Sequence, residues 1–271
     1  MIDHSFQQQL REQYNPEGST LRNIQHSLLR ILFEIDRICS ANGIPYWLDS
    51  GTLIGAQRHG GFIPWDDDLD ICILRKDYRR FCRVMRRELQ TPYKLFALGS
   101  TDGYSHPWPR IIDDSISLER TLPDGTFREE PLWVDIFLMC NGSPSLARKI
   151  DKIYGRCFRR RYRLICDGRW KHAVAVVAYP FAYALAAVSR FAGRFVCPET
   201  YLHDFATGFY SVRKRAHIFP LKTILFEGQS FPAPNDVDSY LRLIYGDYTR
   251  IPEEEKRITH HIASIKYHDN E

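Results

Sequence analysis

The sequence predicts an α/β (α+β) fold, because segments of two kinds alternate along its first half. One kind carries apolar residues at helical spacing, and the other is short and strongly apolar, as buried strands are. Alternation of helices and strands is typical of an α/β core. The chain has 271 residues, 44% of them hydrophobic and 26% charged, which suits one large domain or a domain with an insertion.

The first expected helix begins at Ser19 or Thr20. A short hydroxyl side chain can accept a hydrogen bond from the free N–H groups of the first helical turn. Asn42-Gly43 ends this helix, because glycine adopts the left-handed conformation easily. One apolar stripe runs along it, made of Leu21, Ile24, Leu28, Ile31, Leu32, Ile35 and Ile38.

Shorter patterns predict the remaining elements. Turn residues occur at Glu227-Gly228. A short helix is expected after Ser50-Gly51-Thr52, ending near Gln57. We expect strands at residues 44–48, 69–74, 93–98, 109–120 and 132–139, and longer helices at residues 76–89 and 237–245.

The stretch 141–215 differs from the rest, because it is first basic and then apolar. Residues 148–171 contain ten Lys or Arg and two Asp, whereas residues 173–188 contain no charge. This uncharged run of 16 residues is shorter than the roughly 20 that a membrane-spanning helix needs, and Pro180 interrupts it. Three interpretations stay open: a buried helical hairpin, a helix that lies on or dips into an anionic membrane face, or a true membrane span.

Composition narrows the classes of function and the compartment. The net charge of +4 is too small to indicate nucleic-acid binding, so we expect no nucleic-acid partner. Seven cysteines without a C-x-x-C pair favour reduced thiols and a cytoplasmic location. The polar N-terminal segment lacks the apolar core of a signal peptide, so no secretory signal is expected.

The segment with the most chemistry is an acidic run that leads into a strand. Its members are Asp66, Asp67, Asp68 and Asp70. Because side chains alternate along a strand, Asp68 and Asp70 share one face while the intervening residue points into the core. Two neighbouring carboxylates are a natural site for Mg²⁺ or Mn²⁺. Asp66 and Asp67 are either further ligands or solvated loop residues that orient Asp68.

A third carboxylate is expected from Asp135, the one charge within the apolar segment 132–139. A buried charge needs a partner, and a shared metal ion would supply it. The alternative is an ion pair with an arginine such as Arg110. If Asp135 joins the metal site, we expect it also to act as the base that takes the proton from an acceptor hydroxyl.

Ser50, Gly51 and Thr52 lie where a strand is expected to give way to a helix. A small residue at such a junction lets backbone N–H groups and a hydroxyl approach a phosphate, which a helix N-terminus favours. The acidic pair follows closely in the same unit. Metal ions held by carboxylates can assist phosphoryl displacement, so the pattern predicts metal-dependent phosphoryl transfer.

The residues SGTLIGAQRHGGFIPWDDDLDI, from Ser50 to Ile71, resemble the LicD family of the nucleotidyltransferase superfamily. The segment FEGQSFPAPNDVDSYLRLIYGDYTRIPEEEKRITHH resembles the C-terminal part of the same family. The resemblance spans about residues 21–139 and 219–261. It implies a nucleotidyltransferase-like mixed sheet flanked by helices, with a helical insertion and a helical C-terminal part.

The resemblance also implies roles for residues of this chain. Asp68, Asp70 and Asp135 would be the metal ligands, with Mg²⁺ or Mn²⁺ as the cofactor. Ser50, Gly51 and Thr52 would form the phosphate-binding turn. Arg58 and Arg110 would bind the phosphates of the donor, since guanidinium pairs well with phosphate oxygens.

The implied activity is transfer of a phospho-alcohol, phosphocholine first, from a CDP-activated donor such as CDP-choline. The acceptor would be a hydroxyl of a cell-surface glycan or lipid-linked glycan, such as lipopolysaccharide, teichoic acid or capsule. One alternative is a nucleotidyltransferase that moves NMP to a small molecule or glycan. Another is a non-catalytic, membrane-associated binding module.

These patterns predict three parts of the chain. Residues 1–140 would form the catalytic core, residues 141–215 a basic and apolar helical insertion for membrane or acceptor contact, and residues 216–271 a part that completes the site. The enzyme would be cytoplasmic, with a peripheral contact between residues 148–194 and the anionic inner face of the cell membrane.

Overall fold

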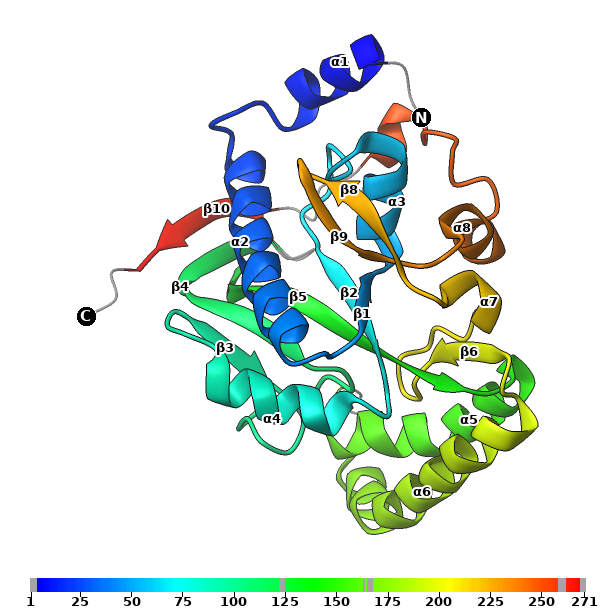
Figure 1. Ribbon diagram of the computed structural model, residues 1–271. Coiled ribbons are helices and arrows are strands. Elements are labelled where there is room, and N and C mark those ends of the chain that lie inside the picture. Colours follow the sequence, from blue (N-terminus) through cyan, green and yellow to red (C-terminus); the bar gives the residue numbers. More distant parts are fainter. Residues whose placement is uncertain (1–3, 122–124, 163, 165–167, 258–261, 269–271) are drawn as a thin grey trace.

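A mixed sheet forms the centre of the protein (Figure 1). The computed structural model describes residues 4–121, 125–162, 164, 168–257 and 262–268. Within these residues the sheet has eight strands, in the order β1-β2-β5-β4-β10, with β3 paired to β4, β6 to β5 and β7 to β6. Strands β2 and β5 run parallel, and the other described pairs of this sheet are antiparallel. The α/β class predicted from the sequence is confirmed.

The bounds of the elements are as follows. The helices are α1 (His4–Tyr14), α2 (Thr20–Ala41), α3 (Ser50–His59), α4 (Tyr78–Glu88), α5 (Pro144–Arg161), α6 (Arg169–Val196), α7 (Arg215–Ile218), α8 (Val237–Tyr245) and the 3₁₀ helix η1 (Glu254–Lys256). The strands are β1 (Tyr46–Leu48), β2 (Asp70–Leu74), β3 (Tyr93–Phe96), β4 (Arg110–Thr121), β5 (Phe127–Asn141), β6 (Thr200–His203), β7 (Arg213–Lys214), β8 (Lys222–Phe226), β9 (Gln229–Ala233) and β10 (Ile262–Tyr267).

Capping residues and apolar spacing in the sequence predicted the positions of several main elements. The hydroxyl of Ser19 accepts a hydrogen bond from the backbone N–H of Arg22 and caps α2 as expected. Helix α8 has the predicted bounds, and β1, β2 and β5 lie where strands were expected. Helix α1 and strand β10 were not predicted. Strand β10 depends on its pairing with β4, which is far away in the sequence, so local patterns do not reveal it.

Helix α6 corrects one interpretation of the apolar run 173–188. The run is helical and packs beside α5, but it is not buried: 17% of its most apolar 18-residue window is buried. By length and composition α6 could cross a membrane. It lies at the rim of the molecule, where neighbours cover only one side of it (Figure 1).

The three predicted parts of the chain share the sheet. Strands β6 and β7, from within 141–215, extend it beyond β5. Strand β10 joins it from the C-terminal part, while the β8–β9 hairpin packs against β1 and α3. The division into a core, an insertion and a completing part stays a prediction.

Candidate active site

Strands β2 and β5 bring two of the expected metal ligands together. In their parallel register Asp70 lies opposite Asp135. Neighbouring strands are about 4.8 Å apart, and residues in register point to the same face. Asp68 precedes Asp70 by two residues, just before β2 begins. The structure therefore places the expected carboxylates on two adjacent strands and on the loop that leads into one of them.

The acidic loop before β2 is compact. Asp66, Asp67 and Asp68 can each offer a carboxylate oxygen within 4.8 Å of the others. Asp67 is buried, and its Oδ2 lies 3.0 Å from Nη1 of Arg120 on β4. The hypothesis of a solvated loop is thus wrong for Asp67, because the β4 arginine draws this carboxylate into the protein.

Electrostatic repulsion accumulates at Asp70. Burial raises the pKa of its carboxyl well above the ordinary value, and the negative charges of Asp135 and Asp68 raise this pKa further. A divalent cation among these oxygens would relieve the repulsion. Oxygen donors of this kind suit Mg²⁺ or Mn²⁺, so the residues present fit the expected ion.

Asp135 has strong partners within the protein. Its Oδ1 accepts hydrogen bonds from Nε1 of Trp108 and Nε of Arg110, both at 2.6 Å, and its Oδ2 accepts from Nε1 of Trp133 at 3.1 Å. The guanidinium of Arg110 also lies over the Trp133 ring, 4.2 Å from its centroid. The alternative weighed for Asp135, an ion pair with Arg110, is therefore present, and its metal role stays a prediction.

The turn at the start of α3 borders the acidic loop. Ser50 adopts a positive φ of 51°, which is uncommon for a residue other than glycine. A Cβ atom at Gly51 would lie 2.9 Å from Oδ2 of Asp66, so glycine allows this close approach. The hydroxyl of Thr52 accepts a hydrogen bond from the backbone N–H of Asp70 at 2.8 Å. The positive φ of Ser50 and the close approach of Gly51 to Asp66 are therefore compatible with the expected phosphate-binding turn beside the carboxylates.

A buried network lies directly beside this turn. Asp49 precedes Ser50, and its carboxylate accepts from the Tyr240 hydroxyl at 2.6 Å and from Nε2 of His203 at 2.9 Å. Nη2 of Arg213 lies 3.4 Å from the same His203 nitrogen. These partners come from β6, β7 and α8. The later parts of the chain therefore hold the start of α3 in place.

Charge explains why this network can be buried. Burial alone would raise the pKa of Asp49, but the His203 hydrogen bond and the Arg213 charge hold it well below the ordinary value. Burial, and after it the Arg213 charge, lower the pKa of His203. The network thus contains an anionic carboxylate, a neutral imidazole and a guanidinium. Sequence reasoning missed it, although Asp49 occupies a typical helix N-cap position.

Arg58 is engaged by the C-terminal part. Its Nη1 donates to the backbone carbonyl of Tyr248 at 2.9 Å and to that of Arg250 at 3.2 Å. Burial lowers the pKa of Arg58 to about 10. These bonds tie α3 to the chain after α8, and the expected contact with a donor phosphate stays a prediction.

Other residues of the site were missed by sequence reasoning. Trp108 and Trp133 hold Asp135, Arg120 holds Asp67, and Nε2 of His106 lies 3.3 Å from Nη1 of Arg110. The segment His106 to Arg110, HPWPR, carries two of these missed residues, His106 and Trp108, together with the expected Arg110. That density of polar and aromatic residues before a strand was the available signal.

Known proteins match the same segments of this chain. The LicD/FKTN/FKRP nucleotidyltransferase domain matches residues 43–104, which include the α3 turn and the acidic loop. Lipopolysaccharide cholinephosphotransferase LicD of Haemophilus influenzae is 29% identical over 260 residues, covering 90% of this chain and 96% of that protein. Ribitol 5-phosphate transferase FKRP of Homo sapiens is 47% identical over 53 residues, covering 18% of this chain and 11% of that protein.

These matches place the protein among enzymes of the phosphotransferase class, and the fold and the acidic site are compatible with that class. The long match carries most weight, because it runs through the sheet, the helical pair and the C-terminal part alike. The chain is thus similar to the LicD family, whose nucleotidyltransferase domain matches residues 43–104.

Proposed function

We propose that this enzyme transfers a phospho-alcohol, phosphocholine first, from a CDP-activated donor to a hydroxyl of a cell-surface glycan. The observation that carries the proposal is the register of Asp70 with Asp135, next to Asp68 and the Ser50–Thr52 turn. It is supported by the relative that matches nearly the whole chain and is named for cholinephosphate transfer to lipopolysaccharide. For this chain the acceptor class is a glycan or lipid-linked glycan.

In the proposed reaction the acceptor hydroxyl attacks the phosphorus atom that carries the alcohol. A new P–O bond forms, the P–O bond to CMP breaks, and CMP leaves with the electron pair of that bond. Mg²⁺ or Mn²⁺ bound to Asp68, Asp70 and Asp135 would neutralise charge on the donor phosphates. The Ser50–Thr52 turn would orient those phosphates at the N-terminus of α3.

Two further roles belong to Arg110 and Asp135. Both oxygens of Asp135 already accept hydrogen bonds from Trp108, Arg110 and Trp133, and these donors compete with a metal ion or an acceptor hydroxyl for the carboxylate. We therefore propose that Arg110 turns from Asp135 to a donor phosphate when the donor binds. This exchange would release Asp135 to the metal site and to the proton of the acceptor hydroxyl.

The direct test is CMP release by the full-length enzyme in the presence of Mg²⁺. CDP-choline, CDP-ribitol and CDP-glycerol are each offered with a glycan acceptor, and the product is analysed for the phospho-alcohol. We expect CMP with at least one donor, and loss of its release with EDTA or with Asp70→Asn. Absence of CMP with all three donors, or transfer of the nucleotidyl group instead, would overturn the proposal.

We also propose a cytoplasmic enzyme that contacts the inner face of the cell membrane peripherally. Support comes from the basic and apolar composition of residues 148–194 and from the exposure of α6. A membrane-bound or lipid-linked acceptor would then meet the enzyme at the surface where it is made or stored.

A further inference from the structure

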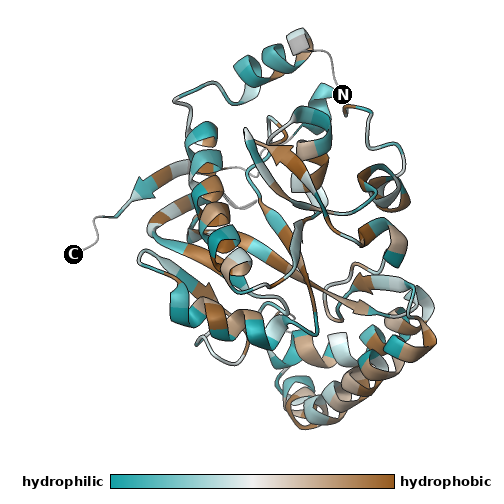
Figure 2. Cartoon of the chain, viewed as in Figure 1, coloured by the Kyte–Doolittle hydropathy of each residue, from teal (hydrophilic) through white to brown (hydrophobic). Residues whose placement is uncertain are grey.

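Helix α6 presents an apolar stripe to solvent along its whole length. Large apolar residues recur on this stripe at intervals of three or four residues, or of seven where Ala184 intervenes. Four of them are each at least 70% exposed: Trp170, Val177, Phe181 and Phe195. An exposed apolar patch of this extent on a protein surface marks an interaction site. The outer stripe comprises Trp170, Val174, Val177, Phe181, Val188, Phe191 and Phe195. Figure 2 shows the apolar colouring of this helix at the rim of the molecule.

The inner face of α6 is committed to the protein. Its buried residues, Ala175, Ala182, Ala186 and Gly193, are spread along almost the whole helix. At its C-terminal end the helix backbone approaches β5 so closely that a Cβ at Gly193 would lie 2.3 Å from the Asn141 carbonyl oxygen. A helix held lengthwise in this way can lie on a bilayer but cannot cross it while these contacts persist.

Positive charge is concentrated on the helical pair. Residues 144–196 contain twelve Lys or Arg and two Asp, although the whole chain has a net charge of only +4. On α5, Arg148, Lys149, Lys152 and Arg156 are exposed. An apolar helix face with basic residues nearby is typical of helices that lie in the interface of anionic membranes.

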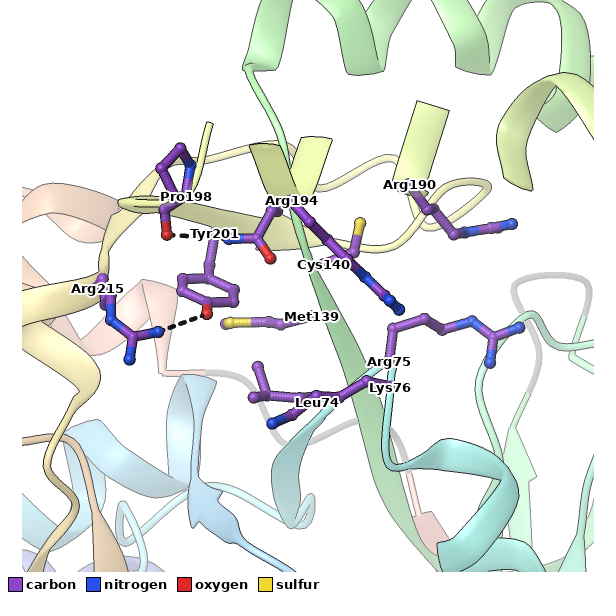
Figure 3. A pocket seen from close by; sticks show the side chains of 11 residues that line it. Leu74, Arg75, Lys76, Met139, Cys140, Arg190, Arg194, Pro198, Tyr201 and Arg215 are labelled. Carbon is purple, nitrogen blue, oxygen red and sulfur yellow. Dashed lines mark hydrogen bonds between the residues drawn. The ribbon is translucent and has the colours of Figure 1, made fainter. Parts of the chain in front are cut away.

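A cationic pocket lies at the C-terminal end of α6 (Figure 3). Its volume is about 290 Å³, and its lining includes the cationic side chains Arg75, Lys76, Arg190, Arg194 and Arg215. Figure 3 shows Arg194 reaching from α6 towards Arg75, while Arg190 on the same helix points to one side.

One nearby carboxylate offsets part of this charge. Asp204 lies 2.9 Å from Nε of Arg75 and 2.6 Å from Nε of Arg190. Within the described residues, no hydrogen bond or ion pair engages the side chain of Lys76 or of Arg194. The pocket therefore keeps an excess of positive charge, which suits a phosphate group.

We infer that α5 and α6 dock the enzyme on an anionic phospholipid bilayer, with the outer stripe of α6 in the interface and a lipid phosphate in the cationic pocket. This inference deepens the membrane contact proposed above. The pocket lies beyond the end of β2 at Leu74, whereas the candidate active site lies at its start. Docking would thus leave the carboxylates clear of the lipid surface.

The charge of the helical pair favours a bilayer over a second copy of the chain. Two copies that met through the helical pair would bring together the exposed basic residues of both α5 helices, among them Arg148, Lys149, Lys152 and Arg156. Like charges at that density repel. Anionic lipid attracts the same residues, and its acyl region takes the apolar stripe.

The test measures flotation of the full-length enzyme with vesicles. Vesicles of phosphatidylglycerol and phosphatidylcholine are compared with phosphatidylcholine alone, at low and high salt. We expect binding to the anionic vesicles that weakens with salt. Phe181→Glu should weaken it by more than about tenfold, because a charge replaces an apolar side chain in the interface. Phe127→Glu, at a residue 62% exposed on β5, is the matched control and should bind like the unchanged enzyme.

The pocket has its own arm of the test. Lys76→Gln and Arg194→Gln should each weaken binding by about fivefold, the loss of one basic contact with anionic lipid. Arg83→Gln, an exposed arginine on α4, is the control and should change little. If inorganic phosphate binds in the pocket but vesicles do not bind to the enzyme, the pocket takes free phosphate and the proposal of a lipid phosphate is wrong.

Other outcomes would also overturn the inference. These are failure of the unchanged enzyme to bind anionic vesicles at low salt, equal binding by Phe181→Glu, or a dimer in velocity sedimentation that requires Phe181 and excludes vesicles. CMP release with a soluble acceptor is measured in parallel. Binding without CMP release would refute the proposed transfer alone, and CMP release without binding would refute the docking alone.

Discussion

Arg110 lies between two partners that compete for its charge. In this structure its guanidinium pairs with Asp135 and covers Trp133. A donor phosphate would attract the same guanidinium. In the proposed reaction the balance between the two partners would decide whether Asp135 is available to a metal ion, so this one side chain would link donor binding to the metal site.

Replacement of Arg110 by glutamine should separate these roles. We expect the KM for the CDP-donor to rise by about tenfold or more, because a charged hydrogen bond to phosphate is worth roughly 1.5–3 kcal/mol. The Mg²⁺ concentration for half-maximal activity should fall, since Asp135 loses its competing cation. Steady-state kinetics with varied donor and Mg²⁺ measure both. A higher Mg²⁺ requirement would contradict the exchange of partners.

Gly51 has a role that its size explains. Replacement by alanine would put a Cβ atom 2.9 Å from Asp66 Oδ2 and displace this carboxylate or the turn. We expect activity to fall by about tenfold or more, as small misplacements at a reacting centre do, with little change in melting temperature. Gly142→Ala, which meets only the Leu202 side chain at 3.3 Å, is the control. Unchanged activity in Gly51→Ala would argue against a phosphate turn at this position.

Among the elements, α6 and α3 differ in what holds them. Helix α3 is tied by Asp49 to β6, β7 and α8, and by Arg58 to the chain after α8. Helix α6 is held by one stripe of small residues and by the Arg190–Asp204 ion pair. The first arrangement suits a rigid phosphate turn, and the second leaves a broad face for a partner.

The close approach of α6 to β5 predicts a stability effect at Gly193. Alanine there would place its Cβ 2.3 Å from the backbone oxygen of Asn141, so the helix must move outward. We expect a loss of about 1–3 kcal/mol in the free energy of unfolding, the usual cost of overpacking. Urea denaturation measures it, with Ala192→Val on an exposed position of the same helix as the control. Equal stability of the two variants would contradict the tight contact.

At the scale of the whole molecule, buried histidines set a pH dependence. Burial lowers the pKa of His59 to about 3 and that of His106 to about 4, and it lowers the pKa of His203 as well. Below about pH 6.5 the unfolded chain binds protons at these residues and the folded chain does not. The free energy of unfolding should therefore fall as the pH drops from about 6.5 towards 4. The raised pKa of Asp70 has the opposite effect, because this carboxyl binds its proton more tightly in the folded chain and so favours folding as the pH falls.

His59→Gln isolates one of these contributions. In the folded enzyme Nε2 of His59 accepts a hydrogen bond from Nε of Arg58 at 2.8 Å, which a glutamine oxygen can also do. We expect the fall in stability between about pH 6.5 and 4 to be shallower in this variant by close to one bound proton. Urea denaturation over that pH range measures the slope. An identical slope would show that His59 does not contribute.

What the sequence by itself determined is local. Residue type and spacing determine the cap of α2, the bounds of α8, the strands that carry Asp70 and Asp135 and the turn at the start of α3, because neighbours in the chain decide caps, turns and periodicity. The family resemblance rested on the same short segments. The tertiary structure alone decided the partners of each charge, such as Arg120 for Asp67 and His203 for Asp49. It also decided that α6 is exposed, since burial depends on which distant segments pack against an apolar face and not on how apolar that face is.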